Sequence, residues 1–83
     1  MEIQLYIGIQ SARYLKEYEI LLTFENGEKK VFNVLPDLQK GKFIKLKDKN
    51  LFVTVHMSFD AIEWDNGVEL DPEYVYEQSV QTK

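Results

Sequence analysis

The sequence predicts an α+β fold: a small, mostly antiparallel sheet of about five strands, a short helix after the third strand and a C-terminal helix. Three observations support this prediction. Apolar and polar residues alternate in several short stretches, which is the period of a half-buried strand. Asn-Gly, the strongest short signal for a β-hairpin, separates two of these stretches. Asp71-Pro72-Glu73 has the order of residues that begins a helix.

The first three strands are predicted at residues 3–9, 18–24 and 30–35. The polar-leaning stretch between the first two, residues 10–17, is predicted to be a connection. Asn26-Gly27 lies between the second and third strands and predicts a type I′ turn, which needs a positive φ at both central residues. The third strand ends before a proline, because proline cannot donate a hydrogen bond to the ladder.

The middle of the chain is less regular. Residues 36–41 predict one short helical turn closed by glycine. Apolar residues alternate imperfectly with lysines at 43–46, so an anchored loop and a strand both agree with the pattern. Residues 51–57 alternate cleanly and predict a strand. A tight turn at 58–60 then leads to a short strand at 61–64.

The C-terminal helix has a well-defined predicted start. Asp71 suits the N-cap and Pro72 the first helical position. Glu73 suits the positive end of the helix dipole. Leu70 and Val75 have the spacing of a hydrophobic staple.

Length and composition predict one domain. The chain has 83 residues, no cysteine, 45% hydrophobic and 13% aromatic residues. These values exclude a multidomain enzyme, a disulfide scaffold and a membrane-spanning chain. We predict a single domain at residues 1–79 and a frayed tail at residues 80–83, and, without a signal peptide at the N-terminus, a cytoplasmic location. The predicted core consists of Ile3, Leu5, Ile7, Tyr18, Ile20, Leu22, Phe24, Phe32, Val34, Leu38, Phe43, Leu46, Phe52, Val53, Val55, Ile62, Trp64, Leu70, Val75 and Tyr76.

Charge divides the chain into two unequal parts. The net charge is −4, but residues 1–49 hold nine basic and seven acidic residues, whereas residues 50–83 hold one basic and seven acidic. Five lysines fall within ten residues: Lys40, Lys42, Lys45, Lys47 and Lys49. They indicate either a solvated connection or a docking surface for an acidic partner, nucleic acid included.

Some apolar side chains are predicted to face outward if only one side of the sheet is covered. Tyr6 and Leu21 are the main candidates, with Phe59 or Met57 as further ones. Open apolar sheet faces are typical of interfaces. We therefore expect a homodimer or a protein partner.

Catalytic and metal-binding patterns are weak. His56 is the single histidine, and a triad with Ser58 and Asp60 lacks a nucleophile elbow. The acidic stretch 65–73 does not have the spacing of a calcium loop. No glycine-rich phosphate loop is present in the sequence. We therefore expect no enzymatic activity, no cofactor and no metal.

One stretch near the C-terminus is specific enough to indicate a family. Its signature residues are Trp64, Asn66, Gly67, Leu70, Asp71, Pro72, Glu73 and Tyr76. Together with the runs 24–28 and 41–43, they resemble the bacterial domain of unknown function 2442 family over essentially the whole chain. Glu69 stands where aspartate is more usual in the family, and Asp65 where proline is common, which argues against strict ligands at these positions. We expect a structural role for the signature residues.

The resemblance implies a small α+β domain of the kind found before helix-turn-helix segments in some bacterial proteins. Some members are encoded beside another small protein, in a pairing proposed to be a toxin–antitoxin module, and no catalytic residues are established. Only seven residues follow Tyr76, so we expect no appended DNA-binding segment. The main hypothesis is a non-enzymatic protein-interaction domain, with an antitoxin-like role as its finer form. The alternative is a nucleic-acid-binding or transcription-associated accessory domain that uses Arg13, Lys16 and the segment 40–49.

Overall fold

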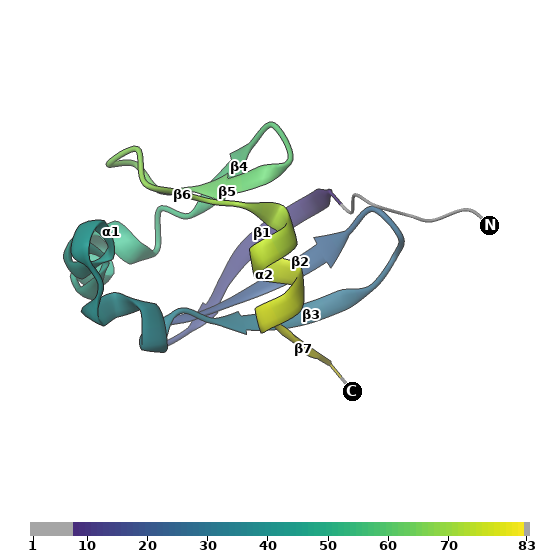
Figure 1. Ribbon diagram of the computed structural model, residues 1–83, viewed down its shortest axis with the longest axis horizontal. Coiled ribbons are helices and arrows are strands. Elements are labelled where there is room, and N and C mark those ends of the chain that lie inside the picture. Colours follow the sequence, from purple (N-terminus) through teal and green to yellow (C-terminus); the bar gives the residue numbers. More distant parts are fainter. Residues whose placement is uncertain (1–7, 83) are drawn as a thin grey trace.

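The structure, a computed structural model, describes residues 8–82 and confirms the α+β prediction (Figure 1). It corrects the number of sheets: two antiparallel sheets of four and three strands replace one sheet of about five. The alternation pattern specifies that one face of a strand is buried and does not specify its partners. Most of the predicted strand 3–9 lies outside the described residues.

The larger sheet contains β1 (Ile9–Lys16), β2 (Glu19–Phe24), β3 (Lys29–Asn33) and β7 (Val80–Gln81), in the order β1-β2-β3-β7. β2 and β3 confirm the predicted second and third strands. Along both strands buried residues alternate with more exposed ones, so each strand turns one face to the core. The sheet therefore supplies much of one wall of the core.

The prediction of a connection at residues 10–17 is wrong, because β1 occupies it. An edge strand needs only one apolar face, and half-buried Ala12 and Tyr14 are enough to provide it. Exposed Arg13 and Lys16, together with register irregularities at both ends of the pairing with β2, are features that protect a sheet edge from further pairing.

The prediction of a frayed tail at residues 80–83 is also corrected for residues 80–82. β7 pairs with Lys30 and Val31 of β3, and the N–H of Thr82 donates to the carbonyl of Lys29 at 3.2 Å. The outer edge of β3 would otherwise leave backbone groups without partners. The chain that leaves the C-terminal helix therefore returns along this edge.

Both Asn-Gly sites form hairpin turns, but the first is not of the type I′ predicted for it. At the first, the N–H of Gly27 donates to the carbonyl of Phe24, and the N–H of Phe24 donates to the carbonyl of Glu28, both at 2.9 Å. The loop has three residues, and its asparagine does not have a positive φ; Gly27, with φ 91°, does. This is the turn that ends in a glycine bulge. The loop at Asn66-Gly67 has the same bonds, and Gly67 has φ 88°.

Three short helices follow the larger sheet: η1 (Leu35–Gln39), η2 (Gly41–Lys47) and α1 (Lys49–Phe52). η1 confirms the helical turn predicted at residues 36–41. Residues 43–46, for which a loop and a strand were both open, instead belong to the 3₁₀-helix η2. These helices close the left side of the molecule in Figure 1.

The strand predicted at residues 51–57 is wrong in its first half. The side chain of Asp48 caps α1 by accepting a backbone hydrogen bond at 3.0 Å, so the chain is helical up to Phe52. Only β4 (His56–Ser58) is extended. Phe52 is fully buried, whereas Val53, predicted to be core, is 46% exposed.

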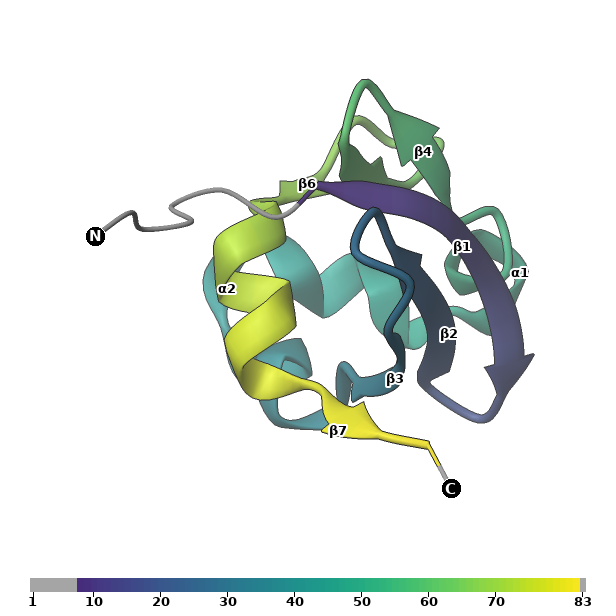
Figure 2. The same cartoon turned by 90° about the vertical axis from the view of Figure 1, so that its right-hand side faces the viewer.

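The smaller sheet joins β4 to β5 (Ala61–Glu63) and β6 (Glu69–Leu70). In Figure 1 it lies above the larger sheet, and α2 (Pro72–Gln78) runs from β6 towards β7. Figure 2 shows α2 on one side of the molecule and the curved β1 on the other. The core lies between these elements.

The start of α2 confirms the prediction in detail. Asp71 is the N-cap, and its carboxylate accepts a hydrogen bond from the N–H of Tyr74 at 3.3 Å. Pro72 occupies the first turn. Leu70 and Val75 are both buried, as a hydrophobic staple requires.

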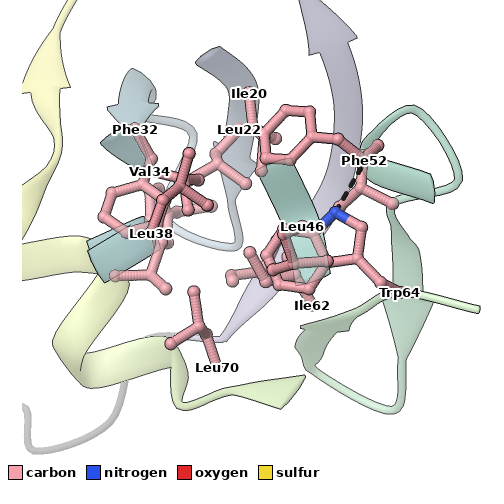
Figure 3. Packing of buried hydrophobic residues seen from close by; sticks show 14 residues of the cluster. Ile20, Leu22, Phe32, Val34, Leu38, Leu46, Phe52, Ile62, Trp64 and Leu70 are labelled. Atoms are coloured by element: carbon pink, nitrogen blue, oxygen red, sulfur yellow. Dashed lines mark hydrogen bonds between the residues drawn. The ribbon is translucent and has the colours of Figure 1, made fainter. Parts of the chain in front are cut away.

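Figure 3 shows side chains from both sheets and from the short helices meeting in one core. The buried apolar residues are Ile9, Ile20, Leu22, Phe24, Phe32, Val34, Leu38, Leu46, Phe52, Val55, Ile62, Trp64, Leu70 and Val75. All but Ile9 were predicted. Three further predicted core residues are only half-buried: Tyr18, Phe43 and Tyr76.

Candidate interaction surfaces

The lysine-rich segment, residues 40–49, is held on the core by η2. Residues three apart share one side of a 3₁₀-helix. Leu46 is fully buried and Phe43 is half-buried, so this pair fixes the inner side of η2. All five lysines of the segment are exposed, and they therefore stand on a fixed backbone.

Two of the five lysines have acidic partners. The Nζ of Lys49 lies 3.0 Å from a carboxylate oxygen of Glu17, and this hydrogen bond raises the pKa of Lys49. The Nζ of Lys40 lies 3.3 Å from a carboxylate oxygen of the buried Asp37. Within residues 8–82, the other three form no ion pair: Lys42, Lys45 and Lys47.

Tyr18, in the turn between β1 and β2, joins this turn to the segment. Its hydroxyl donates to the carbonyl of Lys47 at 2.5 Å, and the Nζ of Lys49 lies 5.2 Å from its ring centroid. Its ring also meets that of Phe52 edge-on at 5.1 Å. The turn that follows Lys16, the last residue of β1, therefore borders the lysine-rich segment.

Phe59 is the most exposed of the apolar residues that we predicted to face outward. Leu21 is half-buried in β2, opposite Arg13 of β1 and Val31 of β3. Met57 is half-buried as well. Tyr6 lies outside the described residues. Phe59 is 100% exposed.

The first part of the signature closes the core. Trp64 is fully buried, and its Nε1–H donates to the carbonyl of Phe52 at 3.0 Å, as the dashed line in Figure 3 shows. Asn66 accepts a hydrogen bond from the N–H of Val68 at 3.2 Å within the glycine-bulge loop. Each of these residues has a structural role in the fold.

The second part of the signature includes a polar network that the sequence pattern did not predict. The hydroxyl of Tyr76 donates to Glu28, and this hydrogen bond lowers the pKa of the Glu28 carboxyl. Lys30 is 8% exposed; its Nζ donates to the carbonyl of Tyr76 at 2.9 Å and lies 3.7 Å from the ring centroid. The sequence contains one signal for this network: Lys30 lies two residues before the core residue Phe32 and therefore shares its face of the strand. The network joins α2 to the β2–β3 hairpin.

His56 contacts groups other than those of the triad considered from the sequence. Its Nδ1 lies 2.8 Å from the carbonyl of Thr54, and its Nε2 lies 3.2 Å from a carboxylate oxygen of Glu63. Both contacts raise the pKa of His56, the backbone contact most. Neither ring nitrogen bonds Ser58 or Asp60 among the described residues.

The acidic stretch 65–73 does not converge on one point. Its carboxylates are all exposed, and Asp71 caps α2. Among residues 8–82, no group of three or more His, Cys, Asp and Glu side chains is placed to hold a metal ion.

Comparison with known families places the whole described fold in one of them. A family model described as "protein of unknown function (DUF2442)" matches residues 9–81. The chain belongs to the DUF2442 family. The match extends from β1 to β7 and thus confirms the resemblance seen in the signature residues. Comparisons of this DUF2442 chain with curated proteins and with solved structures found no match. No helix within residues 8–82 has the length and apolar character needed to cross a membrane.

Proposed function

We propose that this DUF2442 chain is a non-enzymatic, bacterial and cytoplasmic protein-interaction domain whose lysine-rich segment docks an acidic partner. The observation that supports the proposal is that the core holds the backbone of η2, to which these lysines belong, in place. Buried Leu46 anchors η2, so Lys42, Lys45 and Lys47, which form no ion pair with any residue from 8 to 82, present their charges from a defined surface. Ordered charges lose less entropy on binding than charges on a loop.

The charge pattern gives this surface electrostatic selectivity. The lysine-rich segment is the main basic stretch of a chain whose net charge is −4. Attraction of acidic partners to such a stretch raises the association rate and is screened over about 8–10 Å at physiological salt. An antitoxin-like role in a two-protein module would be the finer form of this proposal, with the partner protein supplying the acidic surface.

A labelled poly-glutamate peptide tests the proposal directly. Lys42→Glu with Lys45→Glu is expected to weaken peptide binding by about tenfold or more, because two attractive contacts become repulsive. Lys29→Glu with Lys83→Glu makes the same change in net charge outside the lysine-rich segment and serves as the matched control. Equal losses in the two double variants would show that net charge, and not the segment, drives binding.

Nucleic-acid binding remains the second candidate because Tyr18 lies against Lys47 and Lys49. Aromatic and basic side chains side by side are typical of single-strand binding. Glu17, which pairs with Lys49, opposes it. A single-stranded oligonucleotide in the same assay distinguishes the two candidates. Nucleic-acid binding is favoured if the oligonucleotide binds more tightly than poly-glutamate, and if its steep salt dependence is reduced in the Lys42→Glu, Lys45→Glu variant.

A further inference from the structure

The tip of the β4–β5 hairpin combines two features that do not help an isolated domain to fold. Phe59 is 100% exposed, and its φ is 60°. It is the first residue of a two-residue turn, the position at which a positive φ favours glycine. Aromatic residues are enriched in protein interfaces, and backbone in sparsely populated conformations concentrates at functional sites.

The hairpin holds Phe59 on a fixed support. The N–H of Ile9 donates to the carbonyl of Asp60 at 3.2 Å, which ties the turn to β1. Three cross-strand pairs join β4 to β5, and Ile62 is fully buried beneath them. A side chain presented in this way loses little conformational entropy on binding, since its backbone is already ordered.

The hairpin that carries Phe59 is acidic. Residues 56–65, the acidic hairpin, carry three carboxylates, on Asp60, Glu63 and Asp65, and one histidine, His56. Glu63 lies directly opposite Glu69 of β6 and also pairs with His56 at 3.2 Å, which offsets part of the repulsion between the two glutamates. The complement of this surface is an apolar side chain surrounded by cations.

The chain carries that complement on η2. Ile44 is 48% exposed and lies within the lysine-rich segment, beside Lys45 and between Lys42 and Lys47 in sequence. Figures 1 and 2 show the β4–β5 turn projecting from the top of the molecule, away from η2 and α1. The two surfaces therefore do not meet within one chain and are free to meet between two.

We propose that the acidic hairpin of one copy docks on η2 of a second copy, with Phe59 against Ile44 and the hairpin carboxylates facing the lysines. This inference rests on the proposed function and names its acidic partner as a second copy of this chain. The contact joins two different surfaces, so it is head-to-tail and generates rings or open chains.

Sedimentation velocity of the full chain tests the contact. Between about 10 µM and 1 mM, where small transient interfaces associate, the mass is expected to rise above the 9.8 kDa of one chain, and to fall again at high salt. Phe59→Ser and Ile44→Ser are each expected to weaken association by about 30-fold or more. An equimolar mixture of the two variants is expected to form a dimer and nothing larger, because each variant retains one intact surface.

Val80→Ser is the matched control. Val80 is 69% exposed in β7, outside both surfaces, so this variant is expected to associate like the wild type. A wild type that stays monomeric throughout the concentration range overturns the inference. Single variants that associate like the wild type, or a mixture that stays monomeric, overturn it too.

The poly-glutamate assay separates this inference from the function on which it rests. A monomeric wild type that binds the peptide through Lys42 and Lys45 overturns self-association and leaves the acidic docking surface standing. A wild type that neither associates nor binds the peptide overturns both.

Discussion

Two phenylalanines seven residues apart offer a direct test of where the stability of this domain lies. Phe52 is fully buried and meets Tyr18 edge-on at 5.1 Å and Trp64 at 5.8 Å. Phe59 is fully exposed. The same substitution, to alanine, removes the same atoms at both positions, so any difference in effect reports on burial.

Phe52→Ala is expected to lower the free energy of unfolding by about 3–5 kcal/mol, because it removes buried surface and leaves a cavity. Its edge-on aromatic contacts place it towards the upper end of that range. A domain of this length has a total stability of about 4–12 kcal/mol, so the variant loses a third or more of it. Phe59→Ala is expected to change stability by at most about 0.5 kcal/mol.

Urea unfolding, followed by far-UV circular dichroism and by the fluorescence of the single tryptophan, measures both variants. If Phe52→Ala does not fold, Phe52→Leu is expected to lose about 1–1.5 kcal/mol. A loss below about 1 kcal/mol for Phe52→Ala, or an equal loss for Phe59→Ala, would refute the assignment of Phe52 to the core.

Three further predictions concern single groups. The raised pKa of His56 means that its protonated form stabilises the fold below pH 6.5, and that this contribution is lost as pH rises through the raised pKa. His56→Gln should remove this pH dependence from the midpoints of urea unfolding. A pH profile equal to that of the wild type would contradict the prediction. Asp71→Ala should lose about 1 kcal/mol through loss of the α2 cap, and Glu73→Ala a smaller amount of about 0.3 kcal/mol, because it removes only a charge near the helix dipole. Gly67→Ala should lose about 1 kcal/mol because Gly67 has φ 88°, and a thermal midpoint equal to that of the wild type would disprove this.

The parts of the fold that were predictable depend on local chemistry. Asp71 caps α2 and Asn26-Gly27 turns a hairpin because side-chain and backbone groups a few residues apart determine both. β1 was missed because an edge strand lacks the strong alternation of β2. The helical turn at 49–52 was missed because Leu51 and Val53 alternate as in a strand, while the Asp48 cap selects helix.

The candidate surfaces were predictable only in composition. The charges of the segment 40–49 and the outward position of Phe59 follow from residue types and alternation. The positive φ of Phe59 and the burial of Lys30 depend on tertiary contacts, such as the bond from Ile9 to Asp60 and the stacking of Lys30 on Tyr76. Patterns within a few residues do not contain such contacts.

The pairing of β7 with β3 also bears on how the domain forms during translation. Lys30 pairs with Gln81, so this ladder closes only after residue 81 has left the ribosome. Ile62, Trp64 and Val75, which fill the core, also emerge late. A nascent chain that ends before them leaves Phe52 without its tryptophan neighbour. We therefore expect folding to wait until the residues after Ile62 have emerged. Chains on ribosomes stalled at residue 60 should be sensitive to protease.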